Sequence, residues 1–246
     1  MSESSTENPL PRNAASWAQP VERMTVGDVP SEAINLNVAG RRPMSPLQGF
    51  GQLWQKTYRI EFTDAAVSPE TLIKEWKTHF PEFWPSGNRF YGSVSGVAPG
   101  DVVVLNVAGP GGMTLSTGIR VIYADDESFS FMTPEGHMFA GMITFSSYDE
   151  KDHTVAQVQA LIRANDPVYE MSFRMGFGHK AEDAFWYQTL NNLASHFETS
   201  GSISQRNVLV DKKVQWSEVK NVWQNAAIRT VLYMPVHLVK RLFGKA

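Results

Sequence analysis

The alternation of apolar and polar residues predicts a sheet-rich centre. Residues 54–62 (WQKTYRIEF) alternate, with Trp54, Lys56, Tyr58 and Ile60 on one face, which is the pattern of a half-buried strand. Further short segments are rich in β-branched and aromatic residues and are separated by Gly, Pro and Asp turns. Successive short strands with tight links predict an antiparallel meander. These segments are residues 101–107, 113–124, 128–133, 141–148 and 154–164.

Helical periodicity flanks this run of strands. Ser68 is placed to cap a helix that begins at Pro69 and ends before Pro81. Asp166 is placed to cap a second helical region that extends to Phe197. Glycines 176 and 178 interrupt that region, which predicts either one long kinked helix or two helices with a bend.

The C-terminal part adds a strand at residues 206–215 and a helical stretch at 216–245, broken near Pro235. We expect residues 216–234 to dock an apolar face on the domain or on a partner subunit, which includes a homodimer through this helix. Residues 236–245 are short and basic, so we expect at most weak membrane-surface contact from them. The expected docking face is Trp216, Val219, Trp223, Ala227 and Val231.

Composition divides the chain into three parts. Residues 1–45 are rich in Ser, Asn, Pro and Glu, which predicts a disordered or extended N-terminal arm. Residues 46–200 form the expected domain, and residues 201–246 a C-terminal extension of a strand and an amphipathic helical segment. The formal net charge of −3 gives no global basic field, so we expect no nucleic-acid partner.

Cellular context is read from cysteine content and from the ends of the chain. The sequence has no cysteine, and its first residues lack the basic start and apolar core of a secretory signal. No stretch reaches about 18 consecutive apolar residues, the length of a spanning helix. We therefore expect a cytoplasmic protein.

Two stretches give the chain a family resemblance: GIRVIYADDESFSFMTPEGHMFAGMITF (residues 118–145) and AQVQALIRANDPVYEMSFRMG (residues 156–176). With the order strand, helix, antiparallel strands and long helix, they resemble the START-like, or SRPBCC, superfamily. The likeness is strongest to an uncharacterised bacterial branch of it, in which an RV-Y strand precedes an F-F-T-P-GH segment. It covers roughly residues 54–197.

The resemblance implies an α+β helix-grip fold, in which a curved antiparallel sheet wraps a long C-terminal helix, here with N- and C-terminal extensions. It also implies a cavity between sheet and helix that binds a hydrophobic or amphipathic small molecule without a cofactor. Flexible Met and flat aromatic residues suit such a cavity, although an ordinary core has the same composition. The candidate ligand-binding residues are Arg120, Tyr123, Phe131, Met142, Phe145, Tyr169, Phe173 and Trp186.

Whether the protein is an enzyme stays open, because the superfamily has no universal catalytic residue. A cyclase or hydratase would use Glu135, His137 or Tyr123 as acid or base in the same cavity. The favoured alternative is that Thr133–His137 is an ordinary turn, with Gly136 at positive φ and both polar side chains in water. A third alternative is a protein-interaction module that acts through the terminal extensions.

Other chemical motifs are weak. The histidines are scattered without metal-ligand spacing, so we expect no metal site. The glycine-rich segment 109–112 leads into a strand and is interpreted as a hairpin loop rather than a phosphate cradle. Arg163 shares its strand face with two glutamines, which predicts an exposed position. Arg120 is undecided, because both faces of its strand are apolar.

Overall fold

One antiparallel sheet organises the molecule. A computed structural model describes residues 14–30, 32–62, 67–92, 97–109 and 114–243, the last six by their backbone alone. Within these residues nine strands pair in the order β3-β4-β5-β6-β7-β8-β2-β9, and the short β1 pairs with β6. The strands are β1 (Pro43–Met44), β2 (Leu53–Phe62), β3 (Arg89–Tyr91), β4 (Val102–Ala108), β5 (Thr114–Ala124), β6 (Ser128–Pro134), β7 (Phe139–Glu150), β8 (His153–Ala164) and β9 (Ile203–Asp211).

The predicted meander is confirmed as the run from β4 to β8, with every neighbouring pair antiparallel. Strand β2 comes before this run in sequence but pairs with its last strand, β8. Its other edge pairs with β9, so the C-terminal extension supplies an edge strand of the main sheet. The strand predicted at 206–215 begins and ends earlier, at Ile203 and Asp211. The glycine-rich loop between β4 and β5 lies largely outside the described residues.

The helices begin where the sequence places their caps. Ser68 Oγ accepts a hydrogen bond from Thr71 N at 3.2 Å, and Asp166 accepts from Val168 N and Tyr169 N. Gly176, at φ +81°, separates two helices, so the bent alternative is correct. The α-helices are α1 (Pro69–Thr78), α2 (Pro167–Arg174), α3 (Phe177–His196) and α4 (Ala226–Phe243), and the 3-10 helices are η1 (Ala14–Ser16), η2 (Pro46–Gln48), η3 (Phe80–Phe83) and η5 (Trp216–Gln224).

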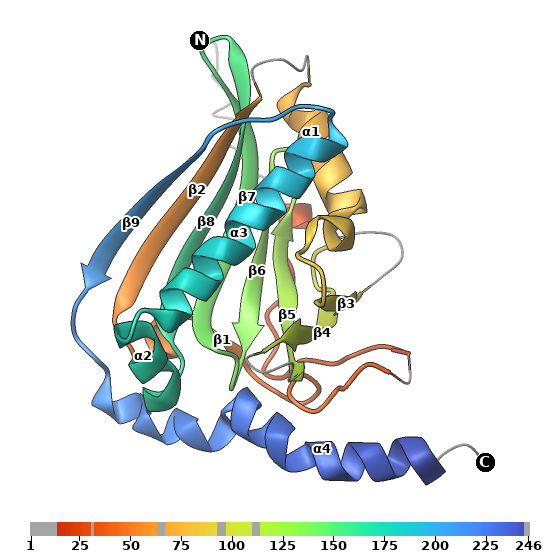
Figure 1. Ribbon diagram of the computed structural model, residues 1–246, viewed down its shortest axis with the longest axis vertical. Coiled ribbons are helices and arrows are strands. Elements are labelled where there is room, and N and C mark those ends of the chain that lie inside the picture. The colour runs from red at the N-terminus through yellow and green to blue at the C-terminus, as the bar shows by residue number, and fades with distance from the viewer. Residues whose placement is uncertain (1–13, 31, 63–66, 93–96, 110–113, 244–246) are drawn as a thin grey trace, which may run out of the picture.

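Helix α3 crosses one face of the curved sheet, and this arrangement is the helix-grip fold (Figure 1). Helices α1 and η3 share that face, and their aromatic side chains meet those of the sheet and α3 in one large core cluster. Phe80 lies at its centre, with its ring about 5 Å from the rings of Phe131 and Phe145. Edge-to-face aromatic packing of this kind adds to the free energy gained by burial alone.

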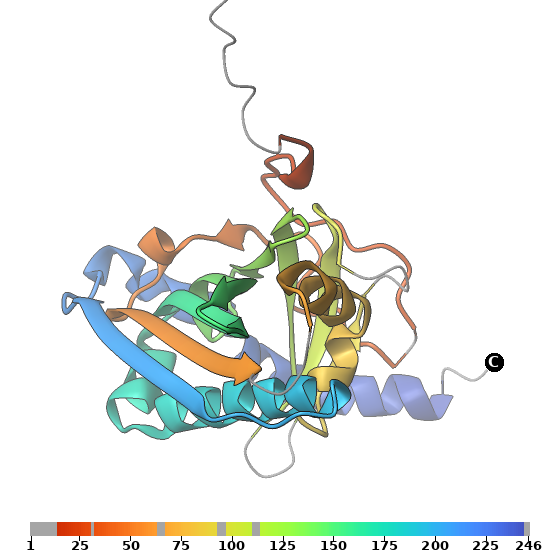
Figure 2. The same ribbon diagram turned by 90° about the horizontal axis from the view of Figure 1, so that it is seen from above.

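The N-terminal arm covers part of the opposite face of the sheet (Figure 2). Met24 and Val38 of the arm are buried against Val104 of β4 in a separate small cluster. Trp17 forms an isolated bridge with Tyr123 of β5. Residues 1–13, the first part of the expected disordered segment, lie outside the described residues. The arm therefore buries part of the outer face of β4 and β5 and forms a second, smaller apolar layer there.

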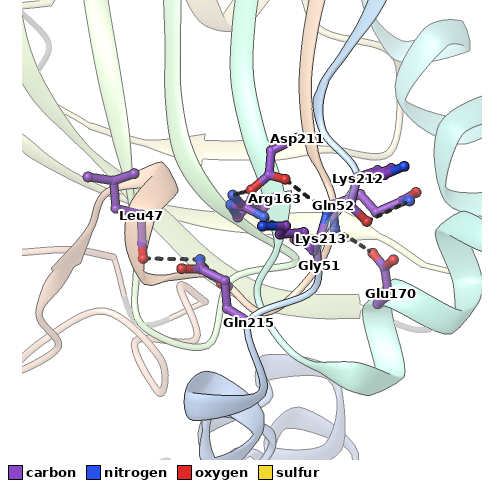
Figure 3. Close-up of polar contacts among 10 residues, drawn as sticks. Leu47, Gly51, Gln52, Arg163, Glu170, Asp211, Lys212, Lys213 and Gln215 are labelled. Atoms are coloured by element: carbon purple, nitrogen blue, oxygen red, sulfur yellow. Dashed lines mark hydrogen bonds and ion pairs between the residues drawn. The ribbon is translucent and has the colours of Figure 1, made fainter.

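The chain after β9 is fastened to the start of β2 by a network around Arg163 (Figure 3). The Arg163 guanidinium donates to the carbonyls of Gly51 (2.6 Å) and Lys213 (2.9 Å) and forms an ion pair with Asp211 (2.7 Å). Arg163 does lie on the outer face, as its strand pattern indicates, but it is only 4% exposed. The expectation of a solvent-exposed arginine is wrong, because the C-terminal segment covers it.

The C-terminal helical segment breaks at Asn225, between η5 and α4, and not near Pro235, which α4 includes. It lies across one end of the sheet (Figure 1). Four of the five residues expected to dock on the domain, Trp216, Val219, Trp223 and Val231, are exposed. The predicted docking of this apolar face on the domain is therefore wrong, and different residues hold the segment in place.

Candidate functional site

A charged cluster is buried between β2 and α3, on the same side of the sheet as the main core. Lys56 shares the inward face of β2 with Trp54 and Tyr58, and its side chain is fully buried. Glu182 and Asp183 occupy successive positions on α3. Since a buried ammonium is costly without an anionic partner, the placement of Lys56 requires this part of α3 to supply one.

The four polar side chains of the cluster lie within direct contact. Lys56 Nζ donates to Asp183 Oδ1 at 2.7 Å, and Tyr58 OH donates to the same oxygen at 2.6 Å. Lys56 Nζ also lies 2.8 Å from Glu182 Oε2. Asp183 reaches the solvent-accessible side of α3, whereas Glu182 is buried. One lysine is thus shared between an outer and an inner carboxylate.

The two carboxylates differ in acidity. Burial raises the pKa of Glu182 to about 7, and the attraction of Lys56 opposes this only in part. Burial also acts to raise the pKa of Asp183, but hydrogen bonds from Lys56 and Tyr58 outweigh it and lower that pKa. Burial, followed by the negative charge of Glu182, raises the pKa of Tyr58. Near neutral pH, Glu182 can therefore either donate or accept a proton while Asp183 stays ionised.

Glu182 has unused hydrogen-bonding capacity. Lys56 and Trp186 are the described side chains that approach the Glu182 carboxylate as hydrogen-bond donors, but neither contact has full hydrogen-bond geometry. The buried Nδ1 of His179, one turn earlier on α3, has no hydrogen-bond partner among the described residues. The 2.8 Å approach of Lys56 to Glu182 is an ion pair without hydrogen-bond geometry. Buried polar atoms are seldom left unsatisfied in native proteins, so these atoms mark a place for a polar group from elsewhere.

Apolar clusters lie on both sides of Glu182. Trp186, one turn later on α3, belongs to the main core cluster. Phe173 of α2 belongs to a second cluster with Phe139 of β7, and its ring lies 5.0 Å from that of His179. Ile143 packs against both clusters. The charged pair therefore sits where two apolar regions meet, beneath the first turns of α3.

Five of the eight predicted ligand-binding residues lie on the α3-covered face of the sheet or on α2 and α3 themselves, and they are buried or partly buried. Phe131, Phe145 and Trp186 lie together in the main cluster, with the rings of Phe145 and Trp186 5.6 Å apart. Phe173 lies in the second cluster. Tyr169 of α2 is partly buried and contacts α4, where its hydroxyl accepts from Ala227 N at 3.1 Å. Burial raises its pKa, so it stays a neutral phenol.

The other three predicted residues lie on the outer face of the sheet. Arg120 Nη2 donates to the carbonyl of Gln19 in the N-terminal arm at 2.6 Å, and the Tyr123 ring lies 4.7 Å from that of Trp17. Met142 alternates with the inward-facing Ile143. A register shift between Val121 and Tyr123 changes the alternation of β5, and the arm makes its outer face apolar too. The strand pattern therefore could not tell interior from outer face.

The turn with Glu135 and His137 packs against the C-terminal segment, and the side chain of His137 is buried. His137 is buried, its Nδ1 accepts from Phe139 N at 3.0 Å, and burial lowers its pKa to about 4. Glu135 forms an ion pair with Arg42 at 2.7 Å. Gly136, at φ +87°, accepts a hydrogen bond from Ala226 N. The expected positive φ is correct, but the expected solvation of His137 is wrong, because η5 and α4 pack over the turn.

Lys56, Tyr58, Glu182 and Asp183 were not recognised as functional from the sequence. A usable signal exists, because Lys56 interrupts the apolar face of an otherwise alternating strand. Glu182 precedes Trp186 by four residues, which places it on the buried face of α3. Two opposite charges on the buried faces of two elements indicate an internal ion pair, but only the tertiary fold shows that these elements touch.

A polar depression of about 290 Å³ lies on the opposite face of β2. Arg59, at its edge, is held by Gln157 (2.9 Å) and by the ring of Tyr148. Its polar side chains are mostly open to water, so it lacks the desolvated charges that distinguish the Lys56–Glu182 cluster. Among the described residues no group of three or more His, Cys, Asp or Glu side chains is arranged to hold a metal ion.

Comparison with protein families gives one match: the family described as "Domain of unknown function (DUF1990)" matches residues 68–180. That region contains α1, the strands β3 to β8, α2 and the start of α3, but neither Lys56 nor Glu182. No protein with curated annotation matches the sequence.

Several solved structures are similar in fold. The di-domain ARO/CYC StfQ from the steffimycin biosynthetic pathway shares 11% identity over 60% of this chain, with a TM-score of 0.47. The match spans 51% of the StfQ chain, about half of its length. Protein Ms6760 from Mycobacterium smegmatis shares 14% identity over 72% of this chain and 100% of its own, with a TM-score of 0.42. The Aha1 dimer from Colwellia psychrerythraea shares 18% identity over 58% of this chain and 96% of its own, with a TM-score of 0.38.

Proposed function

We propose that this protein binds an amphipathic small molecule between the sheet and α3, with the polar group of the ligand at Glu182. The observation that carries the proposal is the buried Glu182 carboxylate, whose Oε2 lies 2.8 Å from Lys56 Nζ and whose two oxygens are not fully satisfied by hydrogen bonds among the described residues. Ligand sites are mostly apolar with a few converging polar groups, and the junction of the two apolar clusters has that composition. The ligand has an apolar body and a hydrogen-bond donor.

Aromatic packing sets where the ligand lies. Phe80, Phe145 and Trp186 fill the space under the C-terminal part of α3. The ligand therefore occupies the region between Trp186 and Phe173, where His179 adds a second unsatisfied polar atom. Phe173 and Trp186 become its apolar contacts, while Arg120, Tyr123 and Met142 have no part in it.

A direct test uses N-phenyl-1-naphthylamine, an apolar fluorescent probe with one N–H donor. The full chain should bind it saturably, and Glu182→Gln should weaken binding roughly tenfold, the effect of one hydrogen bond to a charged group. Glu170→Gln, a buried carboxylate on α2 that pairs with Arg174, is the matched control and should bind like wild type. Absence of saturable binding, or equal affinity in all three proteins, would refute the site.

The split acidity of Glu182 and Asp183 favours a second candidate, an acid/base enzyme of the cyclase or hydratase kind. A carboxyl with a pKa of about 7 can transfer protons at neutral pH, and the ionised Asp183 holds Lys56 beside it. In this candidate Glu182 takes the role first considered for Glu135, His137 or Tyr123.

Native mass spectrometry separates these two candidates. A binding protein should retain the same molecule in wild type and in Asp183→Asn. A hydratase, or a cyclase that eliminates water, should retain molecules that differ by the mass of water between active wild type and the inactive Glu182→Gln variant, and a cyclase that does not should retain isomers that chromatography separates. Identical retained masses in all variants would exclude turnover by this cluster.

A further inference from the structure

Helix α4 is mounted with its apolar side facing solvent. Ile228, Val231, Leu232 and Val236 are 43%, 51%, 73% and 48% exposed. Their spacing of three, four and eight residues from Ile228 places them on one face of the helix. We call these four residues the α4 stripe. In a helix that merely covers a domain, such a stripe faces the domain, so this orientation is the reverse of the usual one.

Buried hydrogen bonds hold α4 in this orientation. Asn37 Nδ2 donates to Thr230 Oγ1 (3.2 Å) and to Ser116 O (2.9 Å), and its Oδ1 accepts from Arg229 Nε (3.0 Å). Asn225 Nδ2 donates to Asp166 Oδ2 at 2.8 Å. Rotation of the helix about its axis to bury the stripe would break the hydrogen bonds that Thr230, Arg229 and Asn225 make. The outward stripe is therefore fixed by the fold.

The preceding segment η5 extends the exposed apolar surface. Trp216 and Trp223 are 71% and 80% exposed, although indole side chains are normally well buried. Among the described residues no helix is long and apolar enough to cross a membrane. An amphipathic helix with tryptophans beside it has instead the features of a segment that lies flat in a membrane interface.

Charge selects the partner. Residues 212–246 contain seven Lys or Arg residues and one acidic residue, a formal charge of +6, whereas residues 1–211 contain 15 basic and 24 acidic residues, a charge of −9. Lys212, Lys213 and Lys220 are exposed beside the tryptophans. An anionic lipid surface would attract the positively charged residues 212–246 and repel the negatively charged remainder of the chain. A two-fold dimer through the stripe would instead bring two +6 segments together.

We propose that η5 and α4 form a peripheral membrane anchor, in which the α4 stripe and Trp223 insert among anionic lipids and the lysines contact their headgroups. This goes beyond the weak contact expected of residues 236–245 alone. Stable peripheral binding needs two signals, and here apolar insertion joins a basic patch. The anchor is independent of the proposed site at Glu182, which lies beneath α3.

The test is co-sedimentation of the full chain with vesicles of phosphatidylcholine, with or without phosphatidylserine, at low and high salt. Wild type should bind the anionic vesicles at least roughly tenfold more tightly than the neutral ones. A fraction should stay bound at high salt, because insertion of apolar side chains is not screened.

The variant Val231→Glu with Leu232→Glu should lose binding at least roughly tenfold, because charged side chains do not insert. Its matched control is Val210→Glu with Leu209→Glu on β9, where Val210 is 51% exposed like Val231. The control should bind like wild type, and both variants should keep the wild-type circular dichroism because all four side chains are exposed. No binding of wild type to anionic vesicles, or equal binding of both variants, would overturn the anchor. So would a wild-type dimer that only the α4 variant dissociates, since the stripe would then be a subunit interface.

Discussion

Helices α3 and α4 meet the sheet in opposite ways. Helix α3 buries Trp186, Leu190 and Leu193 in the main core, so the release of apolar surface from water holds it in place. Helix α4 is held instead by hydrogen bonds between Asn37 and the side chains of Thr230 and Arg229, and it leaves its stripe exposed to water. The difference shows that the period of apolar residues identifies a face of a helix but not what covers that face.

The contrast extends to charge. Helix α3 carries Glu182 into an apolar interior with Lys56 as its counter-ion, a costly arrangement that a purely structural helix does not need. Helix α4 contains no Asp or Glu, and no acidic residue follows Glu218 in the sequence. Helix α3 therefore places an ionisable group in the interior, whereas α4 exposes an apolar surface to solvent.

The largest expected effect concerns apolar burial. Leu190→Ala should lower the free energy of unfolding by about 3 kcal/mol, because it leaves a cavity under α3. Leu232→Ala on α4 should change it by about 0.5 kcal/mol or less, as surface substitutions do. Urea denaturation of both variants measures the difference. Similar losses at the two positions would mean that the α4 stripe is covered in solution.

Next comes the contact between the 133–137 turn and the C-terminal segment. A Cβ at Gly136 would lie 2.0 Å from the carbonyl oxygen of Gln224, whereas one at Gly100, also at positive φ, would meet nothing within 4 Å. Both Ala variants incur the strain of a positive φ, so their difference isolates the clash. Gly136→Ala should therefore cost about 2 kcal/mol more than Gly100→Ala in thermal or urea unfolding. Equal costs would show that the turn and η5 are not packed together.

A smaller effect is expected for the hydrogen bonds that fix the orientation of α4. Asn225→Ala removes the hydrogen bond to the buried Asp166 and should cost about 1.5 kcal/mol. Asn191→Ala, at an exposed position of α3, is its control and should stay within about 0.5 kcal/mol of wild type. If Asn225→Ala unfolds like the control, hydrogen bonds do not fix the orientation of α4.

The last effect is a pH slope, which develops only across the window between the two pKa values of Glu182. The pKa of Glu182 is raised from its ordinary 4.5 to about 7, so the folded state holds a proton that the unfolded state releases between these values. This contribution to stability is present below pH 4.5 and is lost as the pH rises through 7. Glu182→Gln should therefore gain stability relative to wild type as the pH rises across this window. An unchanged difference between Glu182→Gln and wild type would contradict the raised pKa.

Most of the sheet could be predicted from the sequence, because strands β4 to β8 are rich in β-branched and aromatic residues and are separated by turn residues. Helices α1 and α2 were predictable at their first residues from the Ser68 and Asp166 caps. Strands β1 and β3 were missed, since two or three residues carry too little pattern to recognise. Local spacing thus specifies elements well when they are long and capped.

Contacts between distant segments were less predictable. Arg120 and Tyr123 were assigned to the interior because nothing in β5 shows that the N-terminal arm covers its outer face. Lys56 and Glu182 are 126 positions apart, and neither strand nor helix periodicity links them. Only Val231 of the α4 stripe belongs to the docking face expected from the sequence, and the orientation of the stripe depends on Asn37, far away in the sequence.

The contrast between α3 and α4 is tested most directly by thiol accessibility, because the natural sequence has no cysteine. Leu232→Cys and Leu193→Cys each introduce one thiol, on α4 and α3 respectively, into the otherwise unreactive chain. In the folded protein a maleimide should label the Leu232→Cys variant at nearly the rate of the unfolded chain, and anionic vesicles should slow that labelling. The Leu193→Cys variant should react only after unfolding. Protection of both thiols in the free protein would contradict the outward orientation of the stripe, and with it the contrast between the two helices.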